Sequence, residues 1–371
     1  MESIIKAAVE RGASDIHIKA GDVFRARIAG KLQPLTKQRL TPEQTREIAL
    51  KVIPNKQDRS FIDSIKDYDC SWGASGIGRF RVNILKQRSS FMIVMRVIPF
   101  EVPTIEKLGL PKLLETIVEA ERGLLLVTGS SGNGKSSTIA ALVNYLNATH
   151  SKHIVTLEAP IEFLHRDISS SVTQREVGTD TEGFAGALRS ALYQDPDVIV
   201  VDQMLDPEML EAAIRGAETG RLVIATLPTP DAVSTIARLG GMLPAKERDM
   251  GRLRVADALH AVVSQKLIPL ASGEGRRAAL EVLICNSEIR ELIRDRNKVA
   301  DILSVMAQDG ANGMQTFEQH LKQLAADGVI TSEAAEAATS KWAGTESVPK
   351  VRATLKTKSA MKPKRKPAGG R

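Results

Sequence analysis

Residues 129–136 of the chain read GSSGNGKS and match the pattern G-x-x-x-x-G-K-[ST], which is typical of loops that bind nucleotide phosphates. The apolar run GLLLVT comes directly before them, and the helix-compatible stretch SSTIAALVNYL begins at the last of them. Glycines allow such a loop to curl so that successive backbone N–H groups face an anion at the positive end of a helix. The pattern and its setting therefore predict a phosphate-binding loop between a strand and a helix.

The side chains of this loop have different predicted roles. Lys135 is expected to reach the β- and γ-phosphates of ATP, and the Ser136 hydroxyl is expected to bind Mg²⁺. The alternative, a glycine-rich turn without a ligand, agrees less well with a complete match in the required setting. The predicted nucleotide contacts in this part of the chain are Gly129, Ser130, Ser131, Gly132, Asn133, Gly134, Lys135, Ser136 and Ser137.

Length and composition limit the class of protein. A chain of 371 residues exceeds the usual size of one domain, so we expect two hydrophobic cores. Its 43% hydrophobic and 26% charged residues are ordinary for a soluble globular protein. The opening MESIIKAAVERG lacks the apolar core of a signal peptide, and no later apolar run approaches membrane-spanning length, which indicates a cytoplasmic protein. Cys70 and Cys285 lie far apart without zinc-ligand spacing, so we expect reduced, packed thiols.

The positive charge of the chain is concentrated near its end. From Lys350 onward there are nine Lys or Arg and no acidic residue; removing these nine from the 51 basic residues leaves 42, against 44 acidic ones. The body is therefore near neutral. We expect residues 341–371 to form a disordered basic tail, which is either simply solvated or makes salt-sensitive contact with lipid headgroups or another acidic partner.

Residues 1–98 are predicted to form a small mixed α+β domain. The segments ASDIHIKAG and VFRARIAG alternate apolar and polar residues, as half-buried strands do, and GRFRVNIL and SFMIVMRVI add further strands. Between them, a helical period runs from Thr41, the expected N-cap, through Pro42 to Ile53. The segment PFEVP at 99–103 breaks both periods and is the predicted linker.

Residues 104–340 are predicted to form an α/β domain. The apolar runs GLLLVTG, HIVTLE, DVIVVD and RLVIATL alternate with longer helical stretches, as in a parallel sheet covered by helices. RAALEVLIC is expected to be one more strand. The segments around Glu288, Val299, Phe317 and Ser332 are predicted to be helical and to form a carboxy-terminal subdomain.

Three further segments resemble one family, the hexameric ATPases that retract type IV pili, within the wider class of secretion ATPases. ASDIHIKAG resembles the family's amino-terminal signature, TLEAPIEFLH its acidic box, and DPDVIVVDQMLD its Walker B segment. The resemblance covers about residues 1–340 and implies a PAS-like amino-terminal domain followed by a RecA-like P-loop ATPase domain. VTQREVGTDTEGF, GRRAALEVLI and GMQTFEQ are closer to the PilU-like accessory branch than to the PilT-like motor.

The resemblance assigns roles to three charged residues outside the loop. Glu162 in APIEF is implied to be the general base that activates the attacking water, although such a residue is more often a surface acid. Arg81 and Arg96 are implied to reach the nucleotide from the amino-terminal domain, since guanidinium groups bind phosphate oxygens in pairs. Because that domain is separate from the loop, we expect both to approach a neighbouring subunit's nucleotide. The alternative is that Arg81 faces solvent on its strand.

Five positions depart from the family's pattern, where the sequence places hydrolysis: Ala159, Gln203, Leu205, Arg221 and Pro228. VIVVDQ keeps the form of a general P-loop segment in which a buried strand ends at an acidic pair, with Gln replacing the second acid. Asp202 is expected to hold Mg²⁺, directly or through water. Gln203 cannot accept a proton at neutral pH, so the capacity for hydrolysis is in question.

Three classes of function are compatible with these features. The first is an ATP-driven ring motor or motor accessory for pilus retraction, as a homo-hexamer or a mixed ring with a paralogous retraction ATPase, working on a platform protein at the inner face of the cell membrane. The second is an ATP-binding subunit that hydrolyses poorly and acts with an active paralogue. The third, a type II secretion or nucleic-acid motor, is disfavoured for nucleic acid by the near-neutral body and 4% aromatic residues.

Overall fold

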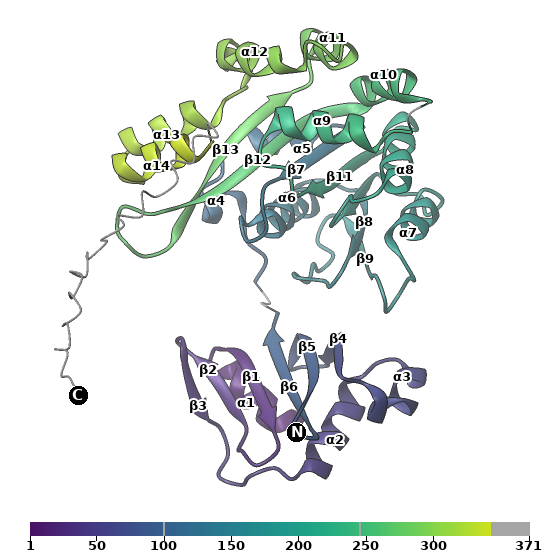
Figure 1. Ribbon diagram of the computed structural model, residues 1–371, viewed down its shortest axis with the longest axis vertical. Helices are drawn as coiled ribbons and strands as arrows, with labels where there is room; N and C mark the ends of the chain where they lie inside the picture. The colour runs from purple at the N-terminus through teal and green to yellow at the C-terminus, as the bar shows by residue number, and fades with distance from the viewer. Residues whose placement is uncertain (99–100, 245, 343–371) are drawn as a thin grey trace, which may run out of the picture.

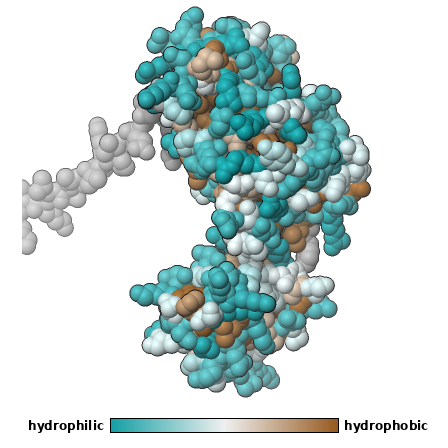
Figure 2. Space-filling view, turned by 90° about the vertical axis from the view of Figure 1, so that its right-hand side faces the viewer, coloured by the Kyte–Doolittle hydropathy of each residue, from teal (hydrophilic) through white to brown (hydrophobic). Residues whose placement is uncertain are grey.

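The computed structural model describes residues 1–98, 101–244 and 246–342, and it shows two lobes that are each built around a β-sheet (Figure 1). Figure 2 shows the lobes joined through a narrower waist, with apolar residues scattered over a mostly hydrophilic face. Two residues of the predicted linker, 99 and 100, and the basic tail beyond Trp342 lie outside the described residues. In the part of the chain that is described, no helix is long and apolar enough to cross a membrane.

The amino-terminal lobe contains a six-stranded antiparallel sheet in the order β3-β2-β1-β6-β5-β4. Its strands are β1 (Ala13–Lys19), β2 (Arg25–Ile28), β3 (Lys31–Pro34), β4 (Asp67–Ala74), β5 (Gly78–Gln87) and β6 (Ser90–Val97). Its α-helices are α1 (Glu2–Glu10), α2 (Pro42–Val52) and α3 (Lys56–Ser60). Thr41 begins α2 with a capping box, because its side chain accepts from Gln44 N while the Gln44 side chain accepts from Thr41 N.

The second lobe contains a seven-stranded sheet in the order β13-β12-β7-β11-β10-β8-β9. Its strands are β7 (Gly123–Thr128), β8 (His153–Glu158), β9 (Ser171–Glu176), β10 (Val198–Val201), β11 (Leu222–Leu227), β12 (Leu259–Pro269) and β13 (Arg276–Ile284). Every pair is parallel except β12 with β13, so the predicted parallel sheet carries one antiparallel edge strand. The central β7 is fully buried, which explains its continuous apolar sequence.

Helices cover both faces of this sheet (Figure 1). Leu125 and Val127 of β7 pack on the side of α4 (Ile105–Leu108), α5 (Leu113–Val118) and α6 (Lys135–Thr149). Leu124 and Leu126 pack on the opposite side, as strand alternation requires. The helices there are α7 (Phe184–Ala191), α8 (Pro207–Glu218), α9 (Ala232–Met242), α10 (Arg248–Ala258), α11 (Ser287–Arg294) and α12 (Ile302–Gln308).

The last two helices, α13 (Phe317–Ala326) and α14 (Ser332–Trp342), pack against β12 and β13 in a smaller apolar cluster. This arrangement confirms the predicted fold class, a mixed amino-terminal part followed by an α/β part with carboxy-terminal helices. The sequence did not predict α1, β3, β4, β9 and β12. In β12 the apolar run is interrupted by two buried polar residues: Ser264, which bonds to Thr128 at the end of β7, and Gln265, which supports the loop described below.

Both cysteines are free in the structure, as predicted from their spacing. Burial raises the pKa of the Cys285 thiol to about 11 and that of the Cys70 thiol to about 12. Thiols with such pKa values are almost entirely protonated at neutral pH and are therefore poor nucleophiles and metal ligands. Their role is packing.

Candidate nucleotide-binding site

The predicted phosphate loop connects the end of β7 to the start of α6 at Lys135. Gly129 adopts a φ of 141°, and a Cβ there would lie 2.4 Å from the Gln265 carbonyl oxygen. Gly134 adopts a φ of 81°, and its Cβ would lie 3.0 Å from Gln265 Nε2. Side chains are excluded at both positions, because the backbone is left-handed and strand β12 passes directly behind the loop.

Strand β12 holds the loop in place through hydrogen bonds. Gln265 donates from Nε2 to the Asn133 carbonyl at 2.6 Å and accepts from Thr138 Oγ1 at 2.7 Å. The Asn133 side chain accepts from the backbone N–H of Leu267 at 3.2 Å. Gln265 is only 3% exposed, so water competes little for these bonds. Asn133 therefore acts on the loop's shape.

Lys135 lies at the mouth of the loop. Its Nζ donates to the carbonyl oxygens of Gly129 at 2.8 Å and Ser130 at 3.2 Å. Burial lowers the pKa of Lys135, and the negative charges of Asp202 and Glu162 act in the opposite direction. The ammonium group is thus placed where carboxylates and loop carbonyls meet, which is a suitable position for a phosphate contact.

The loop opens on a cavity of about 660 Å³, which is within the usual size range of small-molecule sites. The loop and the start of α6 contribute Ser131, Gly132, Gly134, Lys135, Ser136 and Ser137 to its lining. The other lining residues are Ala159, Pro160 and Glu162 of the acidic box, Asp202, Gln203, Thr226 and Pro228 after β10 and at the end of β11, Leu267, Arg276, and Arg81 of the amino-terminal lobe. The carboxyl ends of parallel strands converge here, as they do at ligand sites of open α/β sheets.

Negative charge is concentrated on one side of the cavity. Burial, with further effects of Glu162 and Glu158, raises the pKa of Asp202 to about 6, while Lys135 opposes the shift. Burial also raises the pKa of Glu158, which accepts hydrogen bonds from Thr156 Oγ1 at 2.7 Å and Gln174 Nε2 at 3.0 Å. The carboxylates of Asp202, Glu158 and Glu162 thus outnumber the single nearby ammonium of Lys135. Such an excess of negative charge is suited to binding a divalent cation.

The residues available for that cation are few. Ser136 and Asp202 together line both the main cavity and a smaller cavity beside it. Among the described residues, no group of three or more His, Cys, Asp or Glu could hold a metal ion. One hydroxyl and one carboxylate fit Mg²⁺, because this ion keeps several waters and usually takes one or two protein oxygens together with phosphate oxygens.

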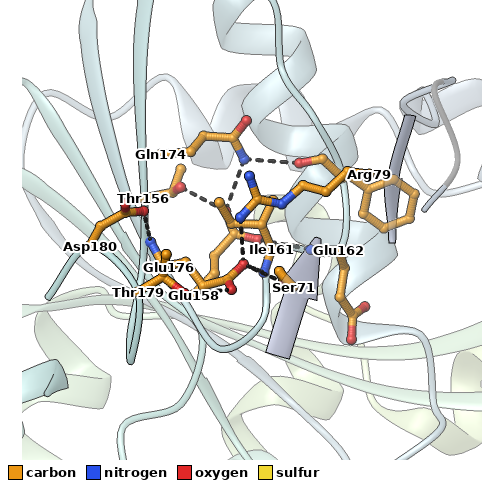
Figure 3. Close-up of polar contacts among 11 residues, drawn as sticks. Ser71, Arg79, Thr156, Glu158, Ile161, Glu162, Gln174, Glu176, Thr179 and Asp180 are labelled. Atoms are coloured by element: carbon orange, nitrogen blue, oxygen red, sulfur yellow. Dashed lines mark hydrogen bonds and ion pairs between the residues drawn. The ribbon is translucent and has the colours of Figure 1, made fainter. Parts of the chain in front are cut away.

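Glu162 belongs to the part of the acidic box that follows β8, and its exposed side chain lies in the cavity. Its backbone N–H donates to Glu158 Oε2 at 3.4 Å, a long bond. Figure 3 shows its carboxylate pointing away from the bonded group formed by Glu158, Gln174 and Glu176. That orientation leaves a carboxylate in the same cavity as the loop, with room for a water molecule.

Only one of the two predicted arginines lines the cavity. Arg81 lines the cavity of its own chain, whereas its approach to a neighbouring subunit's nucleotide stays a prediction. Arg96 lies directly opposite Arg81 in the β5–β6 pair, but it is not among the cavity's lining residues. Its Nε donates to Asp15 Oδ1 at 2.9 Å, and the side chain is 71% exposed. Arg96 is therefore held beside Arg81 and outside the cavity.

The five departures from the family pattern do not all gather at this cavity. Ala159, Gln203 and Pro228 line it, whereas Leu205 is an exposed residue after β10. Arg221 precedes β11, at the end of the sheet opposite to the loop, and its guanidinium bonds to the carbonyl oxygens of Thr219 and Leu192. The prediction that all five lie where hydrolysis occurs is therefore wrong for Arg221, because Arg221 and Pro228 stand before and after the same strand.

Comparison with known proteins agrees with this geometry. The type II/IV secretion system protein family matches residues 1–274, which is more than half of the chain. The chain belongs to this family. The type IV pilus retraction ATPase PilT of Pseudomonas aeruginosa is 41% identical over 330 residues, which cover 89% of this chain and 95% of PilT. PilU, a type IV pilus ATPase of the same organism, is 39% identical over 334 residues, which cover 90% of this chain and 86% of PilU.

Solved structures extend the comparison to the fold of this secretion-family chain. A crystal structure of the pilus retraction motor PilT with bound ADP matches with a TM-score of 0.82 and 43% identity, over 91% of this chain and 96% of that one. The ATPase DotB of Legionella pneumophila matches with a TM-score of 0.80 and 26% identity, over 92% and 95%. The chain thus has the fold of a secretion ATPase. The identities of 41% and 39% do not favour the PilU-like branch over the PilT-like branch.

Several residues that shape the site of this family member were not identified from the sequence. Glu158 adds charge beside Asp202, Gln265 supports the loop, and Gln174 and Glu176 of β9 bond to the acidic box. Glu158 stands in the acidic box TLEAPIEFLH, one residue before Ala159, which departs from the family pattern. The alternation of Gln174 and Glu176 in VTQREVG was a signal for a strand that directs both to one side.

Proposed function

We propose that this chain is an ATP-hydrolysing subunit of a ring motor, or of a motor accessory, that drives type IV pilus retraction. One observation carries the proposal: the phosphate loop, Asp202, Glu162 and Arg81 line a single cavity in a chain that is 41% identical to a pilus retraction ATPase. The near-neutral body argues against a nucleic-acid motor, because nucleic-acid affinity depends on positive charge.

Each group of the cavity has a proposed role. The loop's N–H groups and Lys135 hold the phosphates, and Ser136 and Asp202 hold Mg²⁺. The bound Mg²⁺ neutralises phosphate charge. Glu162 orients the attacking water and accepts its proton, and Arg81 binds phosphate oxygens from the amino-terminal lobe.

The proposed assembly is a closed ring at the inner face of the cell membrane. It is a homo-hexamer or a mixed ring with a paralogous retraction ATPase, and its partner is a membrane platform protein. The basic tail would add electrostatic contact with anionic lipids. Head-to-tail contacts between identical subunits close into a ring when the rotation between neighbours permits it.

Native mass spectrometry tests the ring. With Mg²⁺ and a non-hydrolysable ATP analogue, the purified chain is expected to give a closed oligomer, predominantly a hexamer. The Lys135→Ala variant serves as a control for dependence on nucleotide. Observation of monomers alone, with bound nucleotide present, would contradict a ring formed by this chain without a paralogue.

A second candidate is an ATP-binding subunit that hydrolyses poorly and assists an active paralogue. The observation that favours it is that Gln203 and Pro228, two of the positions that depart from the family pattern, line the cavity. Gln203 is exposed beside Asp202 and supplies no negative charge. Steady-state ATP turnover of the chain, alone and with the paralogue, distinguishes the two candidates.

Gln203→Glu separates the two candidates further. The substitution places a second carboxylate next to Asp202, which strengthens the hold on Mg²⁺ and on the attacking water. For the motor we expect turnover to rise about tenfold, which corresponds to about 1.4 kcal/mol of barrier. For the poorly hydrolysing subunit we expect no rise, because Pro228 remains in the cavity lining. Turnover in the unmodified chain equal to that of a PilT motor would contradict the poorly hydrolysing candidate and would leave no deficit for Gln203→Glu to repair.

A further inference from the structure

Strand β9 supports the acidic box through two alternate side chains. Gln174 donates from Nε2 to the Phe163 carbonyl at 2.9 Å and accepts from the His165 N–H at 2.8 Å. Glu176 accepts from the Ile161 N–H at 3.2 Å. The two side chains therefore hold the backbone on both sides of Glu162, whose own carboxylate stays outside these bonds (Figure 3).

Glu176 also bonds to the other lobe. Its Oε2 accepts from Arg79 Nη2 at 2.7 Å and from Ser71 Oγ at 2.8 Å (Figure 3). Glu176 is only 3% exposed. Burial alone would raise its pKa, but the bonds from Arg79, Ser71 and the Ile161 N–H lower it overall. A charged carboxylate is therefore buried at the junction of the lobes, with donors from both.

The residues that Glu176 contacts lie on either side of Arg81. Arg79 precedes Arg81 by two residues in β5, so both side chains stand on the same face of the sheet. Ser71 is the residue directly opposite Arg81 on the neighbouring strand β4. Arg81 itself lines the nucleotide cavity and also a second cavity shared with Glu176 and Pro160. Glu176 thus bonds to both β4 and β5 directly beside Arg81.

We propose that Glu176 is a positioning residue: it joins the acidic box, at Ile161, to β5, so that Arg81 and Glu162 are placed over the same nucleotide. The inference rests on the proposed function, because it takes ATP to be the ligand of the cavity. Loss of the Arg79–Glu176 pair would loosen the contact between the acidic box and β5, and with it the position of Arg81, although β5 stays paired with β4 and β6. The loop, which β12 holds separately, would keep its shape.

Glu176 is expected to affect the affinity for ATP relative to ADP, which can be measured without hydrolysis. The loop contacts suffice to hold the phosphates of ADP, whereas Arg81, reaching in from the other lobe, adds its contact at the γ-phosphate. A lost bond to a charged group is expected to weaken binding of a non-hydrolysable ATP analogue about tenfold. Affinity for ADP is expected to stay within about twofold.

Isothermal titrations with Mg-ADP and with the Mg-bound analogue test this consequence. Arg79→Gln and Glu176→Gln are each expected to lower the preference for the analogue over ADP about tenfold. Adding Arg81→Gln to either variant is expected to lower it no further, because the pair acts through Arg81. Ser71→Ala provides a milder variant in case Glu176→Gln, which leaves Arg79 without its charged partner, fails to fold.

A second ion pair supplies the control. Arg254 Nε lies 2.7 Å from Glu218 Oε1 in the same lobe as the loop, near the opposite end of the sheet. Arg254→Gln and Glu218→Gln are expected to leave the preference for the analogue over ADP unchanged.

The proposal is overturned if Arg81→Gln lowers this preference but Arg79→Gln and Ser71→Ala do not. It is also overturned if the effects of Arg79→Gln and Arg81→Gln add. Absence of ADP binding to the unmodified chain would overturn the proposed function and this inference together.

Discussion

Lys135→Ala is expected to remove most of the chain's affinity for Mg-ATP. The ammonium lies at the mouth of the loop, where it is partly buried and close to Asp202 and Glu162. Its bonds to phosphate oxygens are charge-assisted, and the loss of such bonds weakens binding roughly 10- to 100-fold. Without this cation, the phosphates also face the carboxylates of the cavity with less compensation. Isothermal titration calorimetry measures the change.

Lys112→Ala is the matched control for this variant, because Lys112 is an exposed lysine outside the cavity. We expect its affinity to equal that of the unmodified chain. Thermal unfolding of both variants excludes a general loss of structure. Equal affinity in the Lys135→Ala variant and the unmodified chain would show that the loop is not the phosphate site.

Glu162→Gln is expected to lower the turnover number about 10²- to 10⁴-fold, which is the usual contribution of a general base. Nucleotide affinity is expected to be retained, because the substitution keeps the shape of the side chain and removes a negative charge near the phosphates. The charge lost at Glu162 also contributes to the raised pKa of Asp202. A coupled assay of phosphate release gives the turnover number, and calorimetry gives the affinity.

Two further variants make this result specific. Glu121→Gln changes an exposed glutamate outside the cavity and is expected to leave turnover unchanged. Glu158→Gln tests the remaining carboxylate beside Asp202. A loss below about threefold in Glu162→Gln, together with a large loss in Glu158→Gln, would transfer the role of base to Glu158.

Features that depend on local sequence were predicted correctly. The phosphate loop is one of them, since its glycines, Lys135 and Ser136 are close in sequence and the flanking apolar run defines the strand. The N-cap at Thr41 is another, because cap and helix adjoin. Strands β7 and β11 were equally clear, since their burial on both faces requires a continuous apolar run.

Features that depend on distant contacts were not predicted. Gln265 lies 132 residues from Asn133, which it supports, and Glu176 lies 105 residues from Ser71. Strand β12 was missed because its polar residues serve the loop and interrupt the apolar pattern. The edge strand β9 is polar for a similar reason: Gln174 and Glu176 bond to the acidic box.

Family resemblance gave the residue types of the site but not all their positions. Arg81 and Arg96 were treated as equivalent, yet Asp15 binds Arg96 while Arg81 is left to enter the cavity. The sequence could not distinguish them, because Asp15 stands 81 residues before Arg96. Arg221 was grouped with Pro228 by motif, although strand β11 separates the two.

Phosphate release from Mg-ATP by the purified ring tests the central claim most directly, that this cavity hydrolyses ATP. The unmodified chain and Lys135→Ala are compared at saturating Mg²⁺, with and without the paralogous ATPase. The account predicts Mg²⁺-dependent release by the chain alone, which Lys135→Ala abolishes. Release by the unmodified chain that equals that of Lys135→Ala under every condition would contradict it.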